Sequence, residues 1–241
     1  MDAMEGIEVR IVDVRDVGPD TVAVTLEAPP GFDARPGQFV QLRATVDDAE
    51  GEDGGEDDGG RDDDGDGGKE EGAAVTRHYS ISSPVVDETF ELTIGVDPEG
   101  TLSPWLAGVS PGATVEVAGP WGRVYYADEP RVVVLAAGPG IGAAVGVAER
   151  AVIEGGSAAV VYRSAVPVHE DRLSALASVG ADVRVTADDA AFEAAVASLL
   201  ESQDAESQTF VYGFEPFVED AREAILATGG DPDSAKVENY G

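Results

Sequence analysis

Apolar and polar residues alternate in short runs along the first half of the chain, with glycine and proline between the runs. Alternation with a period of two predicts half-buried β-strands, and the glycine and proline positions predict the turns between them. The runs that show this pattern are 7–11, 21–26, 38–42, 77–81, 89–96 and 114–118. Regular short strands at this spacing favour a small antiparallel barrel or a sandwich.

From residue 131 the pattern changes to apolar runs that alternate with helical segments. Residues 131–136 are largely apolar, as expected for a strand buried on both faces, and a glycine-rich turn at 138–142 leads into a helix that ends near Ile153. The other elements expected are strands at 158–162, 182–185, 209–212 and 234–238 and helices at 170–179, 188–200 and 215–227. Five strands with intervening helices predict a doubly wound parallel sheet.

The change of pattern falls at Asp128-Glu129-Pro130, where we place a domain boundary. Residues 1–127 are then a β-barrel domain, and residues 128–241 are an α/β domain. Ligands of doubly wound sheets bind at the carboxyl ends of the strands. In this chain those ends include Gly138–Gly142, Tyr162–Ser164 and Gly213.

Residues 47–71 interrupt the barrel with 14 acids, 2 bases, 8 glycines and one alanine. This segment has almost no apolar side chain to bury, so we expect a disordered or salt-solvated loop between two strands. A calcium loop is the alternative, because Asp62, Asp64, Asp66 and Gly67 match the opening of an EF-hand. The position of the closing bidentate glutamate is Ala73, which disfavours a metal site.

The 241 residues have a formal net charge of −33, with 15 Lys and Arg against 48 Asp and Glu. Repulsion on this scale becomes tolerable at molar salt, where the Debye length is about 3 Å, so we expect a cytoplasmic protein of a salt-accumulating halophile. The charge also argues against nucleic acid as a partner. No cysteine is present, which excludes disulfides and iron–sulfur clusters held by this chain, and no segment has the length of a membrane span.

The run that ends in Ser82-Ser83-Pro84 has the most distinctive chemistry. With a period of two, Arg77 lies on the same face as Tyr79, between apolar neighbours, and we expect this buried guanidinium to need an anion. A phosphorylated aromatic cofactor would satisfy the arginine, the ring and the hydroxyl of Ser80 together. The alternative is an ordinary strand whose arginine pairs with an acid.

Two turns could also hold an anion. Residues 98–106 predict a turn into a short helix, and the glycines at 138–142 follow a strand and precede a helix. Either start exposes backbone amides of the type that bind phosphate. An ordinary helix cap and an ordinary strand–helix turn are the alternatives.

These features together resemble the ferredoxin-NADP reductase superfamily, over almost the whole chain outside the acidic loop. Arg77-His78-Tyr79-Ser80 matches the Arg-x-Tyr-Ser flavin motif of that family. Three further matches, in order, are Pro36–Val40, Gly100–Ser103 and the Gly-Pro-aromatic-Gly turn at Gly119–Gly122. The resemblance implies FAD as the cofactor and NADH or NADPH as the substrate.

Residue by residue, the resemblance implies that Arg77 binds the flavin phosphate, that Tyr79 packs on the ring and that Ser80 lies near flavin N5. Glu238 and Tyr240 resemble the closing acid-x-aromatic signature, with a strand end carrying an exposed tyrosine as the alternative. The catalytic candidates are Tyr79, Ser80 and Glu238. The other cofactor-binding candidates are His78, Ile94, Gly95, Val96, Gly100, Thr101, Ser103, Tyr240, Gly138, Gly140, Ile141, Gly142, Arg163 and Gly213.

The resemblance implies an oxidoreductase that transfers hydride between NAD(P)H and flavin N5 and passes electrons to a ferredoxin or a small molecule. The nicotinamide half departs from the family: Gly138–Gly142 lacks a threonine hydroxyl, and Phe214 follows Tyr212-Gly213 where the family has Cys-Gly-Pro. A second hypothesis is therefore a flavin-bearing electron-transfer subunit with a degenerate cleft. A third is a barrel without flavin.

Overall fold

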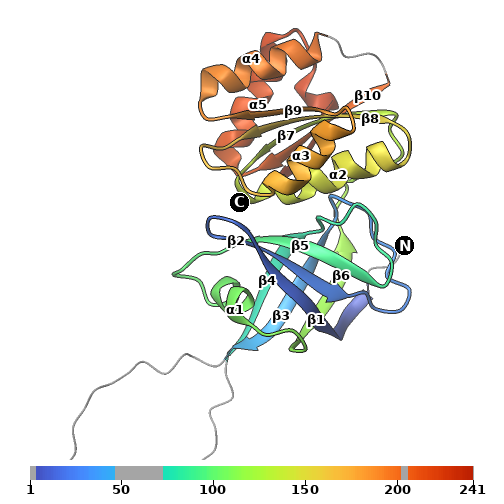
Figure 1. Ribbon diagram of the computed structural model, residues 1–241, viewed down its shortest axis with the longest axis vertical. Helices are drawn as coiled ribbons and strands as arrows, with labels where there is room; N and C mark the ends of the chain where they lie inside the picture. Colours follow the sequence, from blue (N-terminus) through green and yellow to red (C-terminus); the bar gives the residue numbers. More distant parts are fainter. Residues whose placement is uncertain (1–3, 47–72, 202–205, 241) are drawn as a thin grey trace, which may run out of the picture.

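The computed structural model describes residues 4–46, 73–201 and 206–240. Figure 1 shows two bodies stacked along the long axis, an antiparallel barrel and a parallel sheet covered by helices. The predicted loop at 47–71 and its calcium alternative lie outside the described residues. Within the described ranges, no helix is long and apolar enough to cross a bilayer, and no group of three or more ligating side chains could hold a metal ion.

The barrel is a six-stranded antiparallel sheet with the order β4-β3-β6-β1-β2-β5. Its strands are β1 (Met4–Gly18), β2 (Thr21–Glu27), β3 (Phe39–Val46), β4 (Ala73–Ser80), β5 (Thr89–Gly95) and β6 (Thr114–Trp121). The two edge strands approach each other at an isolated bridge between Ile81 and Leu92, both fully buried. One apolar core fills the interior, and the short helix α1 (Leu102–Gly108) contributes Leu102 and Leu106 to it.

The second body is a five-stranded parallel sheet with the order β11-β10-β7-β8-β9. Its strands are β7 (Arg131–Ala137), β8 (Ser157–Arg163), β9 (Asp182–Thr186), β10 (Ser207–Gly213) and β11 (Lys236–Asn239). The helices are α2 (Ile141–Ile153), α3 (Glu170–Ser178), α4 (Asp189–Leu200) and α5 (Glu215–Ala227). Separate apolar cores lie on the two faces of the sheet, as the uninterrupted apolar run at the start of this half predicted. The predicted fold class is confirmed.

Residues 122–130 connect the last barrel strand to the first parallel strand, and our proposed boundary at 128 falls in this segment. Two side chains from the parallel sheet donate hydrogen bonds to the backbone of this segment. The buried hydroxyl of Tyr212 on β10 donates to the carbonyl of Val124 at 2.9 Å, and Lys236 on β11 donates to the carbonyl of Tyr125 at 2.9 Å. The connection is therefore held against the parallel sheet.

Helix α2 packs directly on the barrel, and two glycines make the close approach possible. A Cβ added at Gly142 would lie 2.3 Å from the Cβ of Thr93 on β5, and one added at Gly146 would lie 2.7 Å from the carbonyl oxygen of Ser82. Glycines spaced four residues apart share one helix face. That face of α2 is in contact with the barrel, with α3 beside it in Figure 1.

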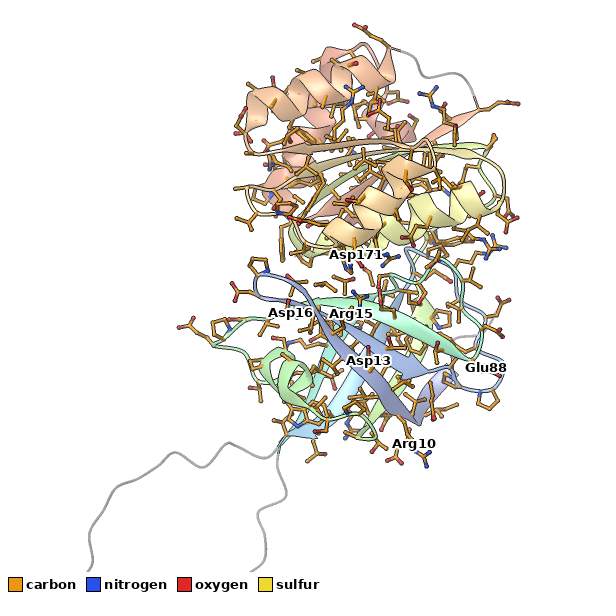
Figure 2. The ribbon with its side chains drawn as sticks, viewed as in Figure 1. Arg10, Asp13, Arg15, Asp16, Glu88 and Asp171 are labelled. Atoms are coloured by element: carbon orange, nitrogen blue, oxygen red, sulfur yellow. The ribbon has the colours of Figure 1, made fainter. Side chains whose placement is uncertain are left out.

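An ion-pair network centred on Arg172 of α3 crosses the same boundary. Its guanidinium donates to Glu149 of α2 at 2.6 and 2.9 Å, to Glu91 of β5 at 3.0 Å and to the carbonyl of Ser82 at 2.7 Å. The Arg172 side chain is 12% exposed. At the rim, Arg15 of β1 lies 3.2 Å from Glu91 and 3.7 Å from Asp171, and Figure 2 shows Arg15 and Asp171 facing each other across the boundary.

His169 completes this contact as a fully buried residue at the start of α3. Its Nε2 lies 2.8 Å from the Thr93 hydroxyl, and its backbone amide donates to the carbonyl of Val17 at 2.9 Å. Burial, and then the nearby Arg172, lower the pKa of His169 to about 4. The neutral imidazole is therefore the form that fits between the domains.

We predict that Arg172→Met lowers the free energy of unfolding by about 3 kcal/mol, because it leaves the partly buried Glu91 and Glu149 carboxylates without their shared cation. Urea unfolding in molar KCl measures the change. Arg184→Met is the matched control, since Arg184 pairs with Asp182 at a more exposed site, and it should cost about 1 kcal/mol or less. Equal losses in the two variants would contradict an organising role for the network.

We also predict that stability falls as pH drops from 7 to 4, with a contribution of about 3 kcal/mol from His169. The folded pKa of about 4 lies below the unfolded value of 6.5, so the unfolded chain binds the extra proton in this window. Urea unfolding of His169→Gln over the same range should show a correspondingly shallower decline. The control is His78→Gln, which removes an exposed imidazole and leaves the contact between α3 and the barrel intact.

Candidate functional site

A cavity of about 770 Å³ lies between the two domains. Its walls come from the barrel on one side and from the carboxyl ends of β7, β8, β10 and β11 on the other. The residues that line it are Pro19, Asp20, Thr21, Phe39, His78, Tyr79, Ser80, Thr93, Gly95, Val96, Asp97, Gly138, Pro139, Tyr162, Ser164, Val166, Val168, Phe214, Glu238, Asn239 and Tyr240. The lining thus brings together eight of the predicted site residues from both halves of the sequence.

On the barrel side, the end of β4 presents His78, Tyr79 and Ser80 to the cavity. Register with β3 pairs Tyr79 with Val40 and His78 with Gln41, so the two rings leave opposite faces, as alternation predicted. The His78 ring lies edge-on to Phe39 at 5.5 Å between centroids. Burial raises the pKa of the Tyr79 hydroxyl to about 12, while the Arg77 charge acts in the opposite direction. Tyr79 is therefore a neutral phenol at the cavity wall.

Arg77 is exposed and outside the cavity lining, so the prediction of a buried guanidinium is wrong. Its partner in the register, Leu42, is buried in the barrel core, which places Arg77 on the inner face of the sheet. However, β4 is an edge strand, and its bridge to β5 lies beyond its end, so the side chain reaches solvent through the open edge. Arg77 donates to the carbonyl of Thr76 at 2.8 Å, and no carboxylate among the described residues forms an ion pair with it.

The predicted diphosphate turn forms the start of α1. Thr101 is exposed at the N-cap position and makes no side-chain cap bond, whereas the buried Ser103 hydroxyl accepts a hydrogen bond from the amide of Asp97 at 3.1 Å. Gly100 lies outside the cavity lining, as do Thr101 and Ser103. Gly95 and Val96 line the cavity, but the side chain of Ile94 is buried in the barrel core.

On the α/β side, the glycine turn has two separate roles. Gly138, at φ +54°, lines the cavity with Pro139. A Cβ at Gly140 would lie 2.3 Å from the carbonyl oxygen of Tyr212, and Gly142 packs on the barrel as described. Ile141 is buried in the core beneath α2. Packing explains Gly140 and Gly142 here, whereas we had interpreted them as room for a diphosphate.

The C-terminal strand closes the cavity beside Ser80. The Ser80 hydroxyl donates to the hydroxyl of Tyr240 at 3.3 Å, and the Tyr240 ring lies edge-on to Phe214 at 6.1 Å. Burial raises the pKa of Tyr240 above its ordinary value and also raises the pKa of the half-buried Glu238 carboxyl. The alternative of an exposed C-terminal tyrosine is therefore wrong, because Tyr240 contacts the barrel.

Two further candidates lie near the cavity but outside its lining. Gly213 ends β10 and is buried against the ring of Phe217. Arg163 ends β8 on the opposite face of the sheet from Tyr162, and it is bound by the carboxylates of Asp189 and Asp220. This candidate for cofactor binding is thus already paired with two acids.

The sequence did not indicate several lining residues. Val166 and Val168 follow β8, while Asp20 and Thr21 come from the turn between β1 and β2. These residues belong to connections on different domains and share no motif. Only Tyr162 and Ser164 could be expected, from their place at the carboxyl end of a parallel strand.

The match to a known protein family lies in the barrel domain. Residues 68–126 match the family described as the oxidoreductase FAD-binding domain. This range includes β4, β5, α1 and β6, and hence the strand that presents Tyr79 and Ser80 to the cavity. A comparison with curated protein sequences found no match.

Solved structures resemble the whole chain. A flavohemoglobin from Malassezia yamatoensis with bound FAD and heme has a TM-score of 0.69 at 17% identity, covering 99% of this chain and 61% of that one. The FAD/NAD-binding domain of a nitric oxide dioxygenase from Vibrio cholerae has a TM-score of 0.67 at 16% identity, covering 99% and 100%. A ferredoxin reductase in carbazole 1,9a-dioxygenase has a TM-score of 0.71 at 19% identity, covering 100% and 70%.

These similarities show that the chain has the ferredoxin reductase-like FAD/NAD-binding fold. The chain spans less than two thirds of the length of the flavohemoglobin. The match in the barrel supports FAD as the cofactor.

Proposed function

We propose that this chain is an FAD-dependent oxidoreductase that oxidises NADH or NADPH and passes the electrons to a separate acceptor. The observation that supports this most directly is the cavity between the domains. It joins Tyr79 and Ser80, from the part of the chain that matches FAD-binding domains, to Gly138 and Tyr162 at the carboxyl ends of the parallel strands. A flavin and a nicotinamide must meet at such a junction.

The residues present fit a flavin. The cavity volume of about 770 Å³ is within the range of roughly 300 to 1,000 Å³ that is typical of ligand sites. Phe39, Tyr79, Tyr162 and Tyr240 give its walls the aromatic character that a flat ring system requires. Outside the rim, the Arg77 guanidinium keeps most of its donors for an anion, because its hydrogen bond in the described structure is to a backbone carbonyl.

Bound FAD would accept two electrons and a proton from the reduced nicotinamide and a second proton from solvent, which gives NAD(P)⁺ and reduced flavin. In our proposal Tyr79 would flank the flavin ring. Ser80, whose hydroxyl now donates to Tyr240, would instead donate its hydrogen bond to the edge of the ring. Gly95 and Val96 contribute backbone at the same wall. Arg77 binds a phosphate of FAD, with Gly100, Thr101 and Ser103 at its diphosphate.

Glu238 is the acid that we propose for proton handling. It lies on β11 opposite Tyr212 in the register, lines the cavity and is half-buried. Burial raises the pKa of its carboxyl, which brings the group closer to a pH at which it can exchange a proton. Its role is to relay a proton between solvent and the interior of the cavity.

The nicotinamide would enter from the α/β side, past Gly138 and Pro139. Phe214 and Tyr240 fill the space next to Ser80, so the nicotinamide can reach the flavin only if these rings move. The same observation favours a second candidate function, a flavin-bearing electron-transfer subunit whose nicotinamide cleft no longer works. The two functions differ in whether nucleotide alone can reduce the flavin.

The electron acceptor in this proposal is a ferredoxin or a small molecule. The chain has no cysteine, so an iron–sulfur cluster in the electron path would belong to another chain. The net charge of −33 supports our expectation of a halophilic source, and it makes molar KCl the appropriate assay medium.

The decisive experiment is anaerobic addition of NADH and of NADPH to the purified, FAD-loaded protein in molar KCl. We expect at least one nucleotide to bleach the flavin absorption band within seconds. Dithionite serves as the control that shows a reducible flavin. If only dithionite bleaches the band, the subunit hypothesis is correct; if the protein does not bind FAD, both flavin functions fail.

We predict that Arg77→Ala weakens FAD binding about 10- to 150-fold, which corresponds to one charge-assisted contact of about 1.5 to 3 kcal/mol. Titration of the apoprotein with FAD, followed by quenching of flavin fluorescence, measures the dissociation constant. Arg10→Ala is the matched control, because Figure 2 shows Arg10 at the end of the barrel away from the parallel sheet. An unchanged affinity in Arg77→Ala would remove this residue from the site.

A further inference from the structure

Arg163 ends β8, and its guanidinium is fixed from several sides. One nitrogen, Nη1, donates to Asp189 Oδ1 and to Asp220 Oδ2, each at 2.7 Å. The guanidinium carbon lies 4.9 Å from the ring centroid of Phe217 and 5.5 Å from that of Phe192. The Arg163 side chain is 18% exposed. Two carboxylates and two aromatic rings therefore hold this cation in one orientation.

The charges in this group sum to minus one, because one guanidinium faces two carboxylates. Asp189 is the first residue of α4 and its side chain is 78% exposed, while Asp220 comes from α5 and is 48% exposed. An anion that approaches Arg163 from solvent thus meets carboxylate oxygens first. The paired arginine is a poor site for a phosphate.

The position matters because this end of the sheet borders the cavity. Tyr162 and Ser164, on either side of Arg163 in sequence, both line the cavity. In doubly wound sheets the nucleotide lies across the carboxyl ends of the strands, where an acid accepts from a ribose 2′-hydroxyl or an arginine accommodates a 2′-phosphate. Here both an arginine and acids occupy the position. The acids, Asp189 and Asp220, are the groups that face solvent.

We infer that this chain uses NADH rather than NADPH, and that Asp189 and Asp220 set the preference by binding Arg163. The inference rests on the proposed function and specifies its substrate. A 2′-phosphate carries a charge of about −1.5 to −2 near neutral pH, and it would be placed against two carboxylates whose cation is already engaged. The 2′-hydroxyl of NADH can instead donate a hydrogen bond to the exposed Asp189 carboxylate.

The preference depends on direct contacts and not on the overall charge of the molecule. In molar salt the Debye length is about 3 Å, so repulsion from distant acids is screened. Contact between a phosphate and the two clamping carboxylates is not screened in this way. The preference for NADH should therefore persist in molar KCl. It should change when Asp189 and Asp220, which clamp Arg163, are substituted.

The experiment compares the two nucleotides in the FAD-loaded protein in molar KCl. Wild type should have a kcat/KM ratio of NADH to NADPH of about ten or more. The double variant Asp189→Asn with Asp220→Asn releases Arg163, and the ratio should fall at least about tenfold, mainly through a lower KM for NADPH. Asp182→Asn, at the separate pair with Arg184, should leave the ratio as in wild type.

Binding of adenosine fragments gives a second measurement that needs no flavin chemistry. By calorimetry, wild type should bind 5′-AMP more tightly than 2′,5′-ADP, and the double variant should reverse this order. Asp189→Asn alone, at the more exposed carboxylate, should shift both measurements in the same direction by a smaller amount if the double variant does not fold.

The outcomes separate the two proposals. Reduction of the flavin by NADPH as fast as by NADH in wild type would overturn the inference and leave the proposed function standing. If neither nucleotide reduces the flavin, the proposed function is overturned and NADH is not a substrate. An unchanged ratio in both clamp variants would show that Asp189 and Asp220 do not set the preference.

Discussion

The structure depends on the contact between α2 and α3 of the parallel domain and β5 of the barrel. Gly142 lets α2 approach Thr93 within van der Waals distance, and Arg172 joins Glu149 of one domain to Glu91 of the other. Because this contact is buried and pairs charged groups across the boundary, the two domains are held at a fixed orientation. The cavity, which lies on the boundary too and shares Thr93 with this contact, is formed by that orientation. The two walls of the cavity, one from each domain, face each other only while this contact is intact.

Because cationic side chains are few in this chain, the partners of each one indicate its role. With 15 Lys and Arg against 48 acids, an arginine can find a carboxylate almost anywhere on this surface. Arg163 and Arg172 bind two or more acidic groups each, as structural cations do. Arg77 differs, since within the described ranges it has a backbone partner and no acidic one. Its donors therefore remain available to an anion, which is the role that we propose for it.

The sequence predicted the fold well because the two halves differ in period and each element has local signals. Asp188 illustrates this: it was expected to begin a helix, and its carboxylate accepts a hydrogen bond from the amide of Ala191. The site was only partly predictable, since a strand motif fixes Tyr79 and Ser80 but not what lies opposite them. Gly142 seemed suited to a diphosphate until its distant neighbour Thr93 was known, and the expectation for Arg77 failed because edge strands cannot be recognised from alternation alone.

The same reasoning identifies which part of the site must move. Opening the domains would expose the carboxylates that Arg172 satisfies, and this would cost several kcal/mol. Tyr240 is held by neutral contacts instead: a backbone bond to Gly213, the ring of Phe214, one hydrogen bond from Ser80 and packing at the margin of the parallel-domain core. Displacing it leaves no charged group without a partner, so it should cost less. Of these two changes, movement of the Tyr240 ring is therefore the less costly one. Access to the cavity wall beside Ser80 should be controlled by Tyr240 and Phe214, and not by a hinge between the domains.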